Sequence, residues 1–389
     1  MVNYGSGQLG EVTISTNTTK KNPILEYTNL VVEEGVTLTL PSRVRLMVTG
    51  TLTVNGTIQV KKDIAGGGGS DAGGASGGNL ELFAKEITGT GEINVDGEHG
   101  STGNSQGNNS NANAGAAYSI PATGKSGSGG VAAERGSNAY RNNNNWSGDR
   151  NGSGKGQAHS SIYNDSTLKA YIEDYLISGA YITQSPIDTL LPGSGGGSGG
   201  GGTGRHRRYD NTNNSNYRDR TEVGGGGGGA GGSFITKGGD GGNGDERYYD
   251  KNNLSVDDST YANGNYKGGE GGSGGGAGGF ILLVSESVSL DVTFSVRGGD
   301  GGDGYWGWRD RNGNAPESGD WSKLDGGGGG GGSGGLIIGF TDKTPTINLN
   351  GGTYGIPGGE RKDGSNNGSN AGKGGEDGAT FLYDVKELV

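Results

Sequence analysis

Aromatic and arginine residues concentrate in three polar stretches of the chain, residues 205–223, 243–267 and 303–325. Tyr, Trp and Arg often carry most of the binding energy in an interface, and loops on a rigid scaffold are where such residues gather. Neighbouring Asn and Ser residues supply adaptable hydrogen bonds. We therefore expect these stretches to bind a receptor, although packing of the aromatics against one another is an open alternative. The candidate receptor-binding residues are Tyr209, Tyr217, Arg218, Tyr248, Tyr249, Tyr261, Tyr266, Tyr305, Trp306, Trp308, Arg309 and Trp321.

Metal binding has one candidate motif, GGDGGD at residues 298–303. It fits the G-G-x-G-x-D calcium pattern, in which turn carbonyls and aspartates bind the ion. The related stretch at 238–243 ends in Asn, and no nine-residue tandem follows. We expect no metal site and no cofactor, with calcium near Asp300 and Asp303 left open.

Catalytic chemistry has weak support in this sequence. Acidic pairs such as Asp257 and Asp258 are plentiful, but nothing singles out two carboxylates across a cleft. The three histidines, His99, His159 and His206, are far apart and suggest no nucleophile–base pair. We predict that the protein is not an enzyme. The alternative is a polysaccharide depolymerase, which would release oligosaccharide from host surface glycan.

Composition excludes several classes of protein. Of 389 residues, 92 are Gly and 8 are Pro, without the third-position glycine of collagen. The net charge of −11 argues against nucleic-acid binding, and the absence of Cys excludes disulfides. No apolar run approaches the roughly 20 residues of a membrane helix. No secretion signal is visible at the start, so we expect cytoplasmic synthesis without ordinary secretion and without membrane insertion.

Short strands are predicted near the start of the chain. In residues 31–62 apolar and polar residues alternate, with Leu38 and Leu40 on one side and Thr37 and Thr39 on the other. Asn55-Gly56 is typical of a hairpin turn. Strands of about four residues every six or seven also suit the rungs of a β-solenoid, which we favour. Residues 1–62 are therefore predicted to be an N-terminal solenoid and attachment segment.

Residues 63–389 are predicted to be a glycine-rich repeat body carrying variable loops. Each copy has a glycine block, a strand, a turn and a second strand. Three copies and a partial fourth with one strand occupy residues 73–100, 275–302, 331–355 and 228–244. The loops are residues 99–192, 205–223, 243–267 and 303–325, and the first of them contains one expected helix, residues 165–179.

Ordered glycine blocks require partners for their backbone. An extended polyglycine segment can form a polyproline-II helix, which has no internal hydrogen bonds. Buried N–H and C=O groups must then bond to neighbouring segments. Such close lateral packing is possible only where side chains are absent or very small, which accounts for the Ser and Ala that interrupt the blocks.

Glycine blocks at residues 193–204, 224–232, 268–279 and 326–335 alternate with inserts at 205–223, 233–267 and 303–325. This alternation resembles the receptor-binding tip adhesins of T-even-like phage long tail fibres. The resemblance covers the C-terminal half of the chain. It implies a sandwich of polyglycine-II helices with variable loops at the distal end. The strand pairs between the glycine blocks depart from that family's pattern.

Taken together, the sequence predicts an all-β fold of β-solenoid or β-helix-like repeats, packed polyglycine-II helices and long surface loops. The expected function is host attachment at the tip of a phage tail fibre. The expected partners are a host outer-membrane protein or glycan and, through the N-terminal region, a tail-fibre or other structural subunit. The location would be the virion, outside the cell, or alternatively a bacterial cell surface. Rivals are a structural glycine-rich filament protein and, from Thr-x-Thr at 37–39 and 51–53, an ice-binding protein.

Overall fold

The computed structural model describes residues 2–63, 66, 73–103, 228–242, 271–305, 326–353 and 371–388, together with the backbone of eight short strands in the intervening stretches. The predicted helix at 165–179 and the glycine block at 193–204 lie outside the described residues. The described structure is mostly strand, and its one helix is the 3-10 helix η3 (Val385–Leu388). The expectation of an all-β fold is confirmed.

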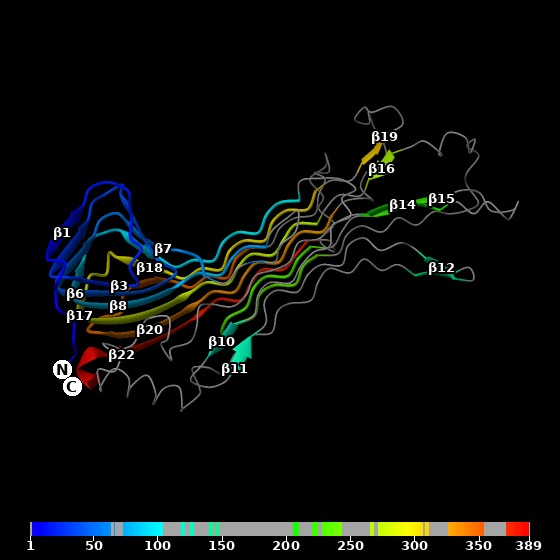
Figure 1. The fold of residues 1–389 in the computed structure, drawn as a ribbon. Coiled ribbons are helices and arrows are strands. Elements are labelled where there is room, and N and C mark those ends of the chain that lie inside the picture. Colours follow the sequence, from blue (N-terminus) through cyan, green and yellow to red (C-terminus); the bar gives the residue numbers. More distant parts are fainter. Residues whose placement is uncertain are drawn as a thin grey trace, which may run out of the picture.

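Two parallel sheets form one end of the molecule (Figure 1). The large sheet has eight strands in the order β1-β4-β6-β8-β17-β20-β22, with β3 also pairing β6, and the small sheet has six in the order β2-β5-β7-β9-β18-β21. The large-sheet strands are β1 (Glu11–Ile14), β3 (Ile24–Tyr27), β4 (Asn29–Val32), β6 (Arg43–Val54), β8 (Asn79–Thr88), β17 (Phe280–Val288), β20 (Leu336–Thr341) and β22 (Ala379–Asp384). The small-sheet strands are β2 (Thr18–Thr19), β5 (Thr37–Leu40), β7 (Thr57–Val60), β9 (Glu92–Asn94), β18 (Thr293–Ser295) and β21 (Thr346–Asn348).

The chain alternates between the two sheets. A strand of the large sheet is followed by one of the small sheet, as in β6 then β7 and β8 then β9, and strands of successive turns pair in parallel. The exception is β3 and β4, which follow one another in the large sheet and both pair with β6. Asn55-Gly56 connects the sheets, so the hairpin alternative at this position is wrong. Both sheets continue across the predicted domain boundary after residue 62, since β7 pairs with β9.

The main core lies between the sheets. The predicted alternation holds in β5, where Leu38 and Leu40 are fully buried and Thr37 and Thr39 are only partly buried. Aliphatic residues from successive strands stack in register, for example Val44 on Leu80 and Leu80 on Ile281. Burying each such side chain stabilises the fold by about 1.5–3 kcal/mol before chain entropy is counted.

The three full sequence repeats become neighbouring strands of the large sheet. Asn79, Phe280 and Leu336 begin β8, β17 and β20 and occupy the same register position, each directly after a Gly-Gly pair. The predicted strand in the partial fourth copy is wrong, because residues 234–236 form a bend. Ser233 Oγ accepts a hydrogen bond from Gly238 N–H at 2.9 Å across this bend, where the chain reverses.

The bend places two apolar residues on the outer face of the large sheet. Phe234 and Ile235 join a second apolar cluster with residues such as Phe83 and Phe280, and η3 contributes Val385 and Leu388. The sheet contributes the following residues to this cluster: Met47, Phe83, Phe280, Leu282, Val284, Leu336, Ile338 and Phe340. The large sheet is therefore apolar on both faces, as parallel sheets usually are.

Among the described residues, nine glycine-rich segments run between the sheets and the opposite end of the molecule (Figure 1). We call them the glycine body, residues 73–78, 95–103, 228–233, 237–242, 271–279, 296–305, 326–335, 349–353 and 371–378. Adjacent segments bond through their backbones at every third residue: Gly272 donates to Gly327, Gly275 to Gly330 and Gly278 to Ser333, at 2.8–2.9 Å.

Segment 326–335 has six neighbours in the glycine body. Its N–H groups donate in rotation to three of them, from Gly329 to Gly302, from Gly330 to Gly229 and from Gly331 to Lys373, and the rotation repeats at residues 332–334. Its carbonyl groups accept from three others, residues 271–279, 237–242 and 349–353. Buried N–H and C=O groups are thereby paired without any β-sheet ladder.

The spacing between segments leaves no room for most side chains. A Cβ built on Gly331 would lie closer than 3.0 Å to the carbonyl oxygen of Gly352, and one on Gly332 would meet the carbonyl of Gly276 in the same way. Serine occurs where its hydroxyl can be used. Ser333 Oγ accepts from Phe234 N–H at 3.1 Å, and Ser273 Oγ accepts from Ser101 N–H at 2.7 Å. These contacts explain why the blocks tolerate only Gly, Ala and Ser in their interior.

Candidate functional site

Besides β12 (Tyr140–Asn142), four short strands from the aromatic inserts lie at the end of the molecule opposite the two sheets and both termini (Figure 1). They are β14 (Arg205–Tyr209), β15 (Arg220–Gly224), β16 (Asn265–Lys267) and β19 (Trp308–Asp310), and we call them the distal strands. β14 pairs antiparallel with β15, and β16 with β19. Because β16 also contacts β14 and β15, the two pairs meet.

The distal strands combine the three aromatic inserts. β14 and β15 come from residues 205–223 with the adjoining Gly224, whereas β16 and β19 come from two different inserts that are about forty residues apart in sequence. Tyr209, Thr221 and Val223 are residue types that favour strands. Pairing between β16 and β19 thus joins positions that the sequence gives no means of matching.

Each aromatic residue of the distal strands has a basic residue as its register partner. Tyr209 pairs with Arg220, Tyr266 with Arg309, and Trp308 with Lys267. The antiparallel registers fix these pairs through the backbone. Strands that carry aromatic and basic residues at paired backbone positions are suited to recognition of a ligand with both an apolar face and a negative charge.

The predicted receptor-binding residues fall into two groups. Tyr209, Tyr266, Trp308 and Arg309 are brought together in the distal strands, and Tyr305 lies at the end of glycine segment 296–305. The others lie outside the described residues, namely Tyr217, Arg218, Tyr248, Tyr249, Tyr261, Trp306 and Trp321. Sequence reasoning omitted Arg220 and Lys267, whose only sign was their nearness to the aromatic inserts.

The glycine body fixes the base of the last insert. Gly326 N–H donates to the Tyr305 carbonyl at 2.9 Å, which joins the two ends of residues 306–325. Three residues farther from the insert on each segment, Gly329 N–H donates to the Gly302 carbonyl at 2.8 Å. β19 therefore begins a few residues beyond a backbone that is held on several sides.

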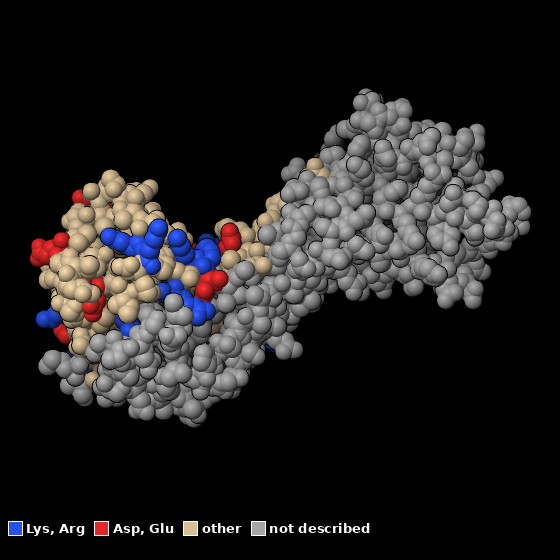
Figure 2. Space-filling model, viewed as in Figure 1, with Lys and Arg blue, Asp and Glu red and all other residues tan. Residues whose placement is uncertain are grey.

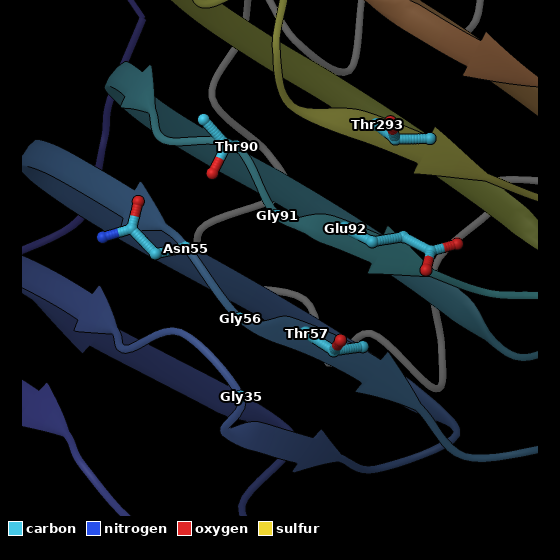
Figure 3. Close-up of a pocket in the computed structure, with 8 residues that line it drawn as sticks. All are labelled: Gly35, Asn55, Gly56, Thr57, Thr90, Gly91, Glu92 and Thr293. Carbon is cyan, nitrogen blue, oxygen red and sulfur yellow. The ribbon is translucent and has the colours of Figure 1, made fainter.

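A shallow hollow lies where the chain passes from the large sheet to the small one (Figure 3). Its lining consists of Gly35, Asn55, Gly56, Thr57, Thr90, Gly91, Glu92 and Thr293. Among these eight residues Glu92 alone is ionisable, and its register partners are Thr57 and Thr293. A single carboxylate flanked by threonines does not supply the acid and base that glycoside hydrolysis needs.

Basic side chains of the described residues gather near the junction of the sheets and the glycine body, beside acidic ones (Figure 2). Two basic residues beside the ends of β6 and β7 have side-chain partners. Arg43 Nε donates to Asp63 Oδ2 at 2.8 Å, and Lys62 Nζ donates to the Asp96 carbonyl at 2.5 Å. Burial lowers the pKa of Lys62, while Asp96 and Glu98 oppose that shift. These contacts give Arg43 and Lys62 structural roles at the junction.

The calcium motif at residues 298–303 is part of the glycine body. The carbonyls of Gly299, Asp300, Gly302 and Asp303 each accept a backbone hydrogen bond. Asp300 Oδ1 accepts from Thr353 N–H at 2.7 Å, and its Oδ2 lies 3.2 Å from His99 Nδ1. Within the described residues, no cluster of three or more His, Cys, Asp or Glu side chains could hold a metal ion. These four carbonyls of the motif are thus hydrogen-bonded to neighbouring segments.

Compared with known protein families, curated proteins and solved structures, the chain matches none of them. No helix in the part of the chain that the structure describes is long and apolar enough to span a membrane. The architecture and the distal strands are therefore the basis for inferring function.

Proposed function

We propose that this chain is a non-enzymatic receptor-binding adhesin of a bacteriophage tail fibre, which contacts the host surface through its distal strands. One observation carries the proposal: aromatic and basic residues from three separate inserts meet at the end of the molecule opposite the sheets and termini. Recognition residues commonly lie on loops held by a rigid scaffold. The glycine body is such a scaffold, because its segments bond to several neighbours at once.

The finer fold assignment belongs to the same proposal. We infer that the paired sheets are a β-solenoid, since turns such as β6–β7 and β8–β9 place one strand in each sheet and stack in parallel. We infer also that the glycine segments are packed polyglycine-II helices. The rotation of hydrogen-bond partners every third residue supports this, because a polyproline-II helix has three residues per turn.

The proposal assigns different roles to the two ends. The sheet end, which holds both termini, would attach to a tail-fibre or other structural subunit through the N-terminal region. The distal end would face an outer-membrane protein or glycan of the host. The protein would then act outside the cell at the tip of the virion fibre, with a bacterial cell surface as the alternative location.

Binding of the purified protein to bacterial cells tests the proposal. Fluorescently labelled full chain is incubated with a broad panel of strains, and bound fluorescence is measured by flow cytometry. We expect binding to a subset of strains, and we expect it to be lost when residues 306–325 are replaced by a Gly/Ser loop. Leu290→Ser is the matched control, because Leu290 is 55% exposed and belongs to the sheet end, between β17 and β18.

Several outcomes would contradict the proposal. Unchanged binding after the loop replacement, or loss of binding in the Leu290→Ser control alone, would place the contact surface elsewhere. Release of oligosaccharide from host glycan would indicate a depolymerase. Self-assembly into filaments without any cell binding would favour a structural protein, and thermal hysteresis would indicate ice binding.

A further inference from the structure

The distal strands differ in charge from the rest of the protein. Their sixteen residues include six Arg or Lys, namely Arg205, Arg207, Arg208, Arg220, Lys267 and Arg309, and two acidic residues, Glu222 and Asp310. They therefore carry a net charge of +4, whereas the whole chain carries −11 and the remaining residues together −15. In the rest of the three inserts acidic residues outnumber basic ones, so the positive charge belongs to the strands.

We propose that the distal strands bind an anionic glycan, a sugar polymer bearing carboxylate or phosphate groups. The inference rests on the proposed function and names the ligand class of the same site. It follows from the juxtaposition of three aromatic–basic register pairs, Tyr209 with Arg220, Tyr266 with Arg309 and Trp308 with Lys267, on two strand pairs that contact each other.

The chemistry of these pairs matches an anionic sugar. A sugar ring has a face of C–H groups that packs on an aromatic ring, while carboxylate and phosphate groups accept the paired N–H donors of Arg. A neutral glycan would make no use of the net positive charge of these strands.

The backbone pairing makes the charge act locally. Within β14 the three arginines lie in five consecutive residues, and β15 places Arg220 opposite Tyr209 at the end of the same strand pair. The Debye length at physiological ionic strength is about 8 Å, so neighbouring charges on paired strands act together and distant acidic residues are largely screened. Binding should therefore weaken as salt rises.

Immobilised polymers of defined chemistry test the inference with the full chain. Polygalacturonic acid supplies carboxylates on sugars, dextran phosphate supplies phosphates on sugars, dextran is the neutral sugar, and polyphosphate is an anion without sugar. We expect binding to at least one of the first two, at least tenfold tighter than to dextran or polyphosphate and at least tenfold weaker at 500 mM than at 50 mM NaCl. Whichever polymer binds better identifies the carboxylate or the phosphate as the preferred group.

Charge-matched variants locate the site. Arg220→Gln with Arg309→Gln should lower affinity for the preferred polymer at least tenfold, and Trp308→Ala should do the same. Arg247→Gln with Lys323→Gln is the control, because it removes two positive charges from the same inserts outside the distal strands. An unchanged melting temperature verifies folding, and the wild-type comparison of polymers and salt needs no variant.

The inference is overturned if the protein prefers neither anionic glycan to dextran and polyphosphate, or if the test and control variants lose affinity equally. Loss of polymer binding with retained, insert-dependent cell binding would refute the anionic glycan and leave the adhesin proposal standing. In that case a protein receptor becomes the ligand. Cell binding that is unchanged when residues 306–325 are replaced would instead refute the proposed function.

Discussion

Replacing one glycine in the centre of the glycine body should destabilise the fold far more than the same change at its edge. In Gly331→Ala the new Cβ would lie closer than 3.0 Å to the carbonyl oxygens of Gly352 and Thr353. Segment 349–353 must therefore move. In Gly374→Ala the nearest atom is the Gly352 oxygen at 3.5 Å, an ordinary contact, so this exposed glycine is the matched control.

The magnitude follows from what the movement disturbs. Overpacking a close-packed region costs about 1–3 kcal/mol. Moving Gly352 also weakens two of its hydrogen bonds, to Gly332 O at 2.7 Å and from Gly375 N–H at 2.9 Å, which contribute about 1 kcal/mol each. Alanine restricts the unfolded chain and recovers about 0.4–1 kcal/mol. The net loss for Gly331→Ala is therefore about 2–4 kcal/mol.

Thermal unfolding followed by circular dichroism measures the effect. At roughly 2–4 °C per kcal/mol, Gly331→Ala should lower the melting temperature by about 5–15 °C. Gly374→Ala should leave it unchanged or raise it slightly. Equal melting temperatures for the two variants would refute the close packing of the central segment.

Three further predictions concern a buried tyrosine, a buried ion pair and the apolar cluster on the outer face of the large sheet. Tyr27 is buried, its hydroxyl has no hydrogen-bond partner among the described residues, and burial raises its pKa. The Tyr27 hydroxyl therefore ionises at lower pH in the unfolded chain than in the folded protein, so the free energy of unfolding should fall as pH rises above about 10. Tyr27→Phe should match the wild type in stability at pH 7. In urea titrations at alkaline pH, the variant should lose less stability than the wild type. Glu81→Leu should cost about 3–5 kcal/mol in denaturant unfolding, because it leaves buried Arg45, 2.6 Å from Glu81 Oε2, without that carboxylate. The double variant Arg45→Leu/Glu81→Leu should lose less than the two single losses combined; simple additivity would exclude coupling. Phe234→Ala should cost about 3–5 kcal/mol by emptying the second apolar cluster, and a loss under about 1 kcal/mol would mean that the bend does not dock there.

Much of the strand architecture could be predicted from local pattern. Alternation in TLTL revealed the buried side of β5, and a Gly-Gly pair before an apolar run marked the starts of β8, β17 and β20. Both signals depend on near neighbours in the chain. Residues 233–237 also follow a Gly-Gly pair and gave the same local signal, but they form a bend. Gly238 N–H donates to Ser233 Oγ across the bend, and Phe234 N–H donates to Ser333 Oγ in another glycine segment.

Other features were beyond sequence reasoning for physical reasons. A glycine carries no side chain to identify its partner, so nothing in residues 326–335 indicated which six segments surround them. Strand periodicity gives the two faces of a strand but not its neighbour, so the pairing of β16 with β19 could not be derived. The aromatic residues of the inserts were predicted to bind, but their pairing with Arg220, Arg309 and Lys267 required the backbone register.

Hydrogen exchange on the protein bound to envelopes of a bacterial strain that it recognises tests whether the distal strands are the contact surface. Mass spectrometry of peptides compares exchange in the free and bound protein across the whole chain. We expect added protection in peptides covering residues 205–224, 265–267 and 306–310, with none in β1 to β7 at the sheet end. Protection confined to the sheet end, with unchanged exchange in the distal peptides, would contradict it.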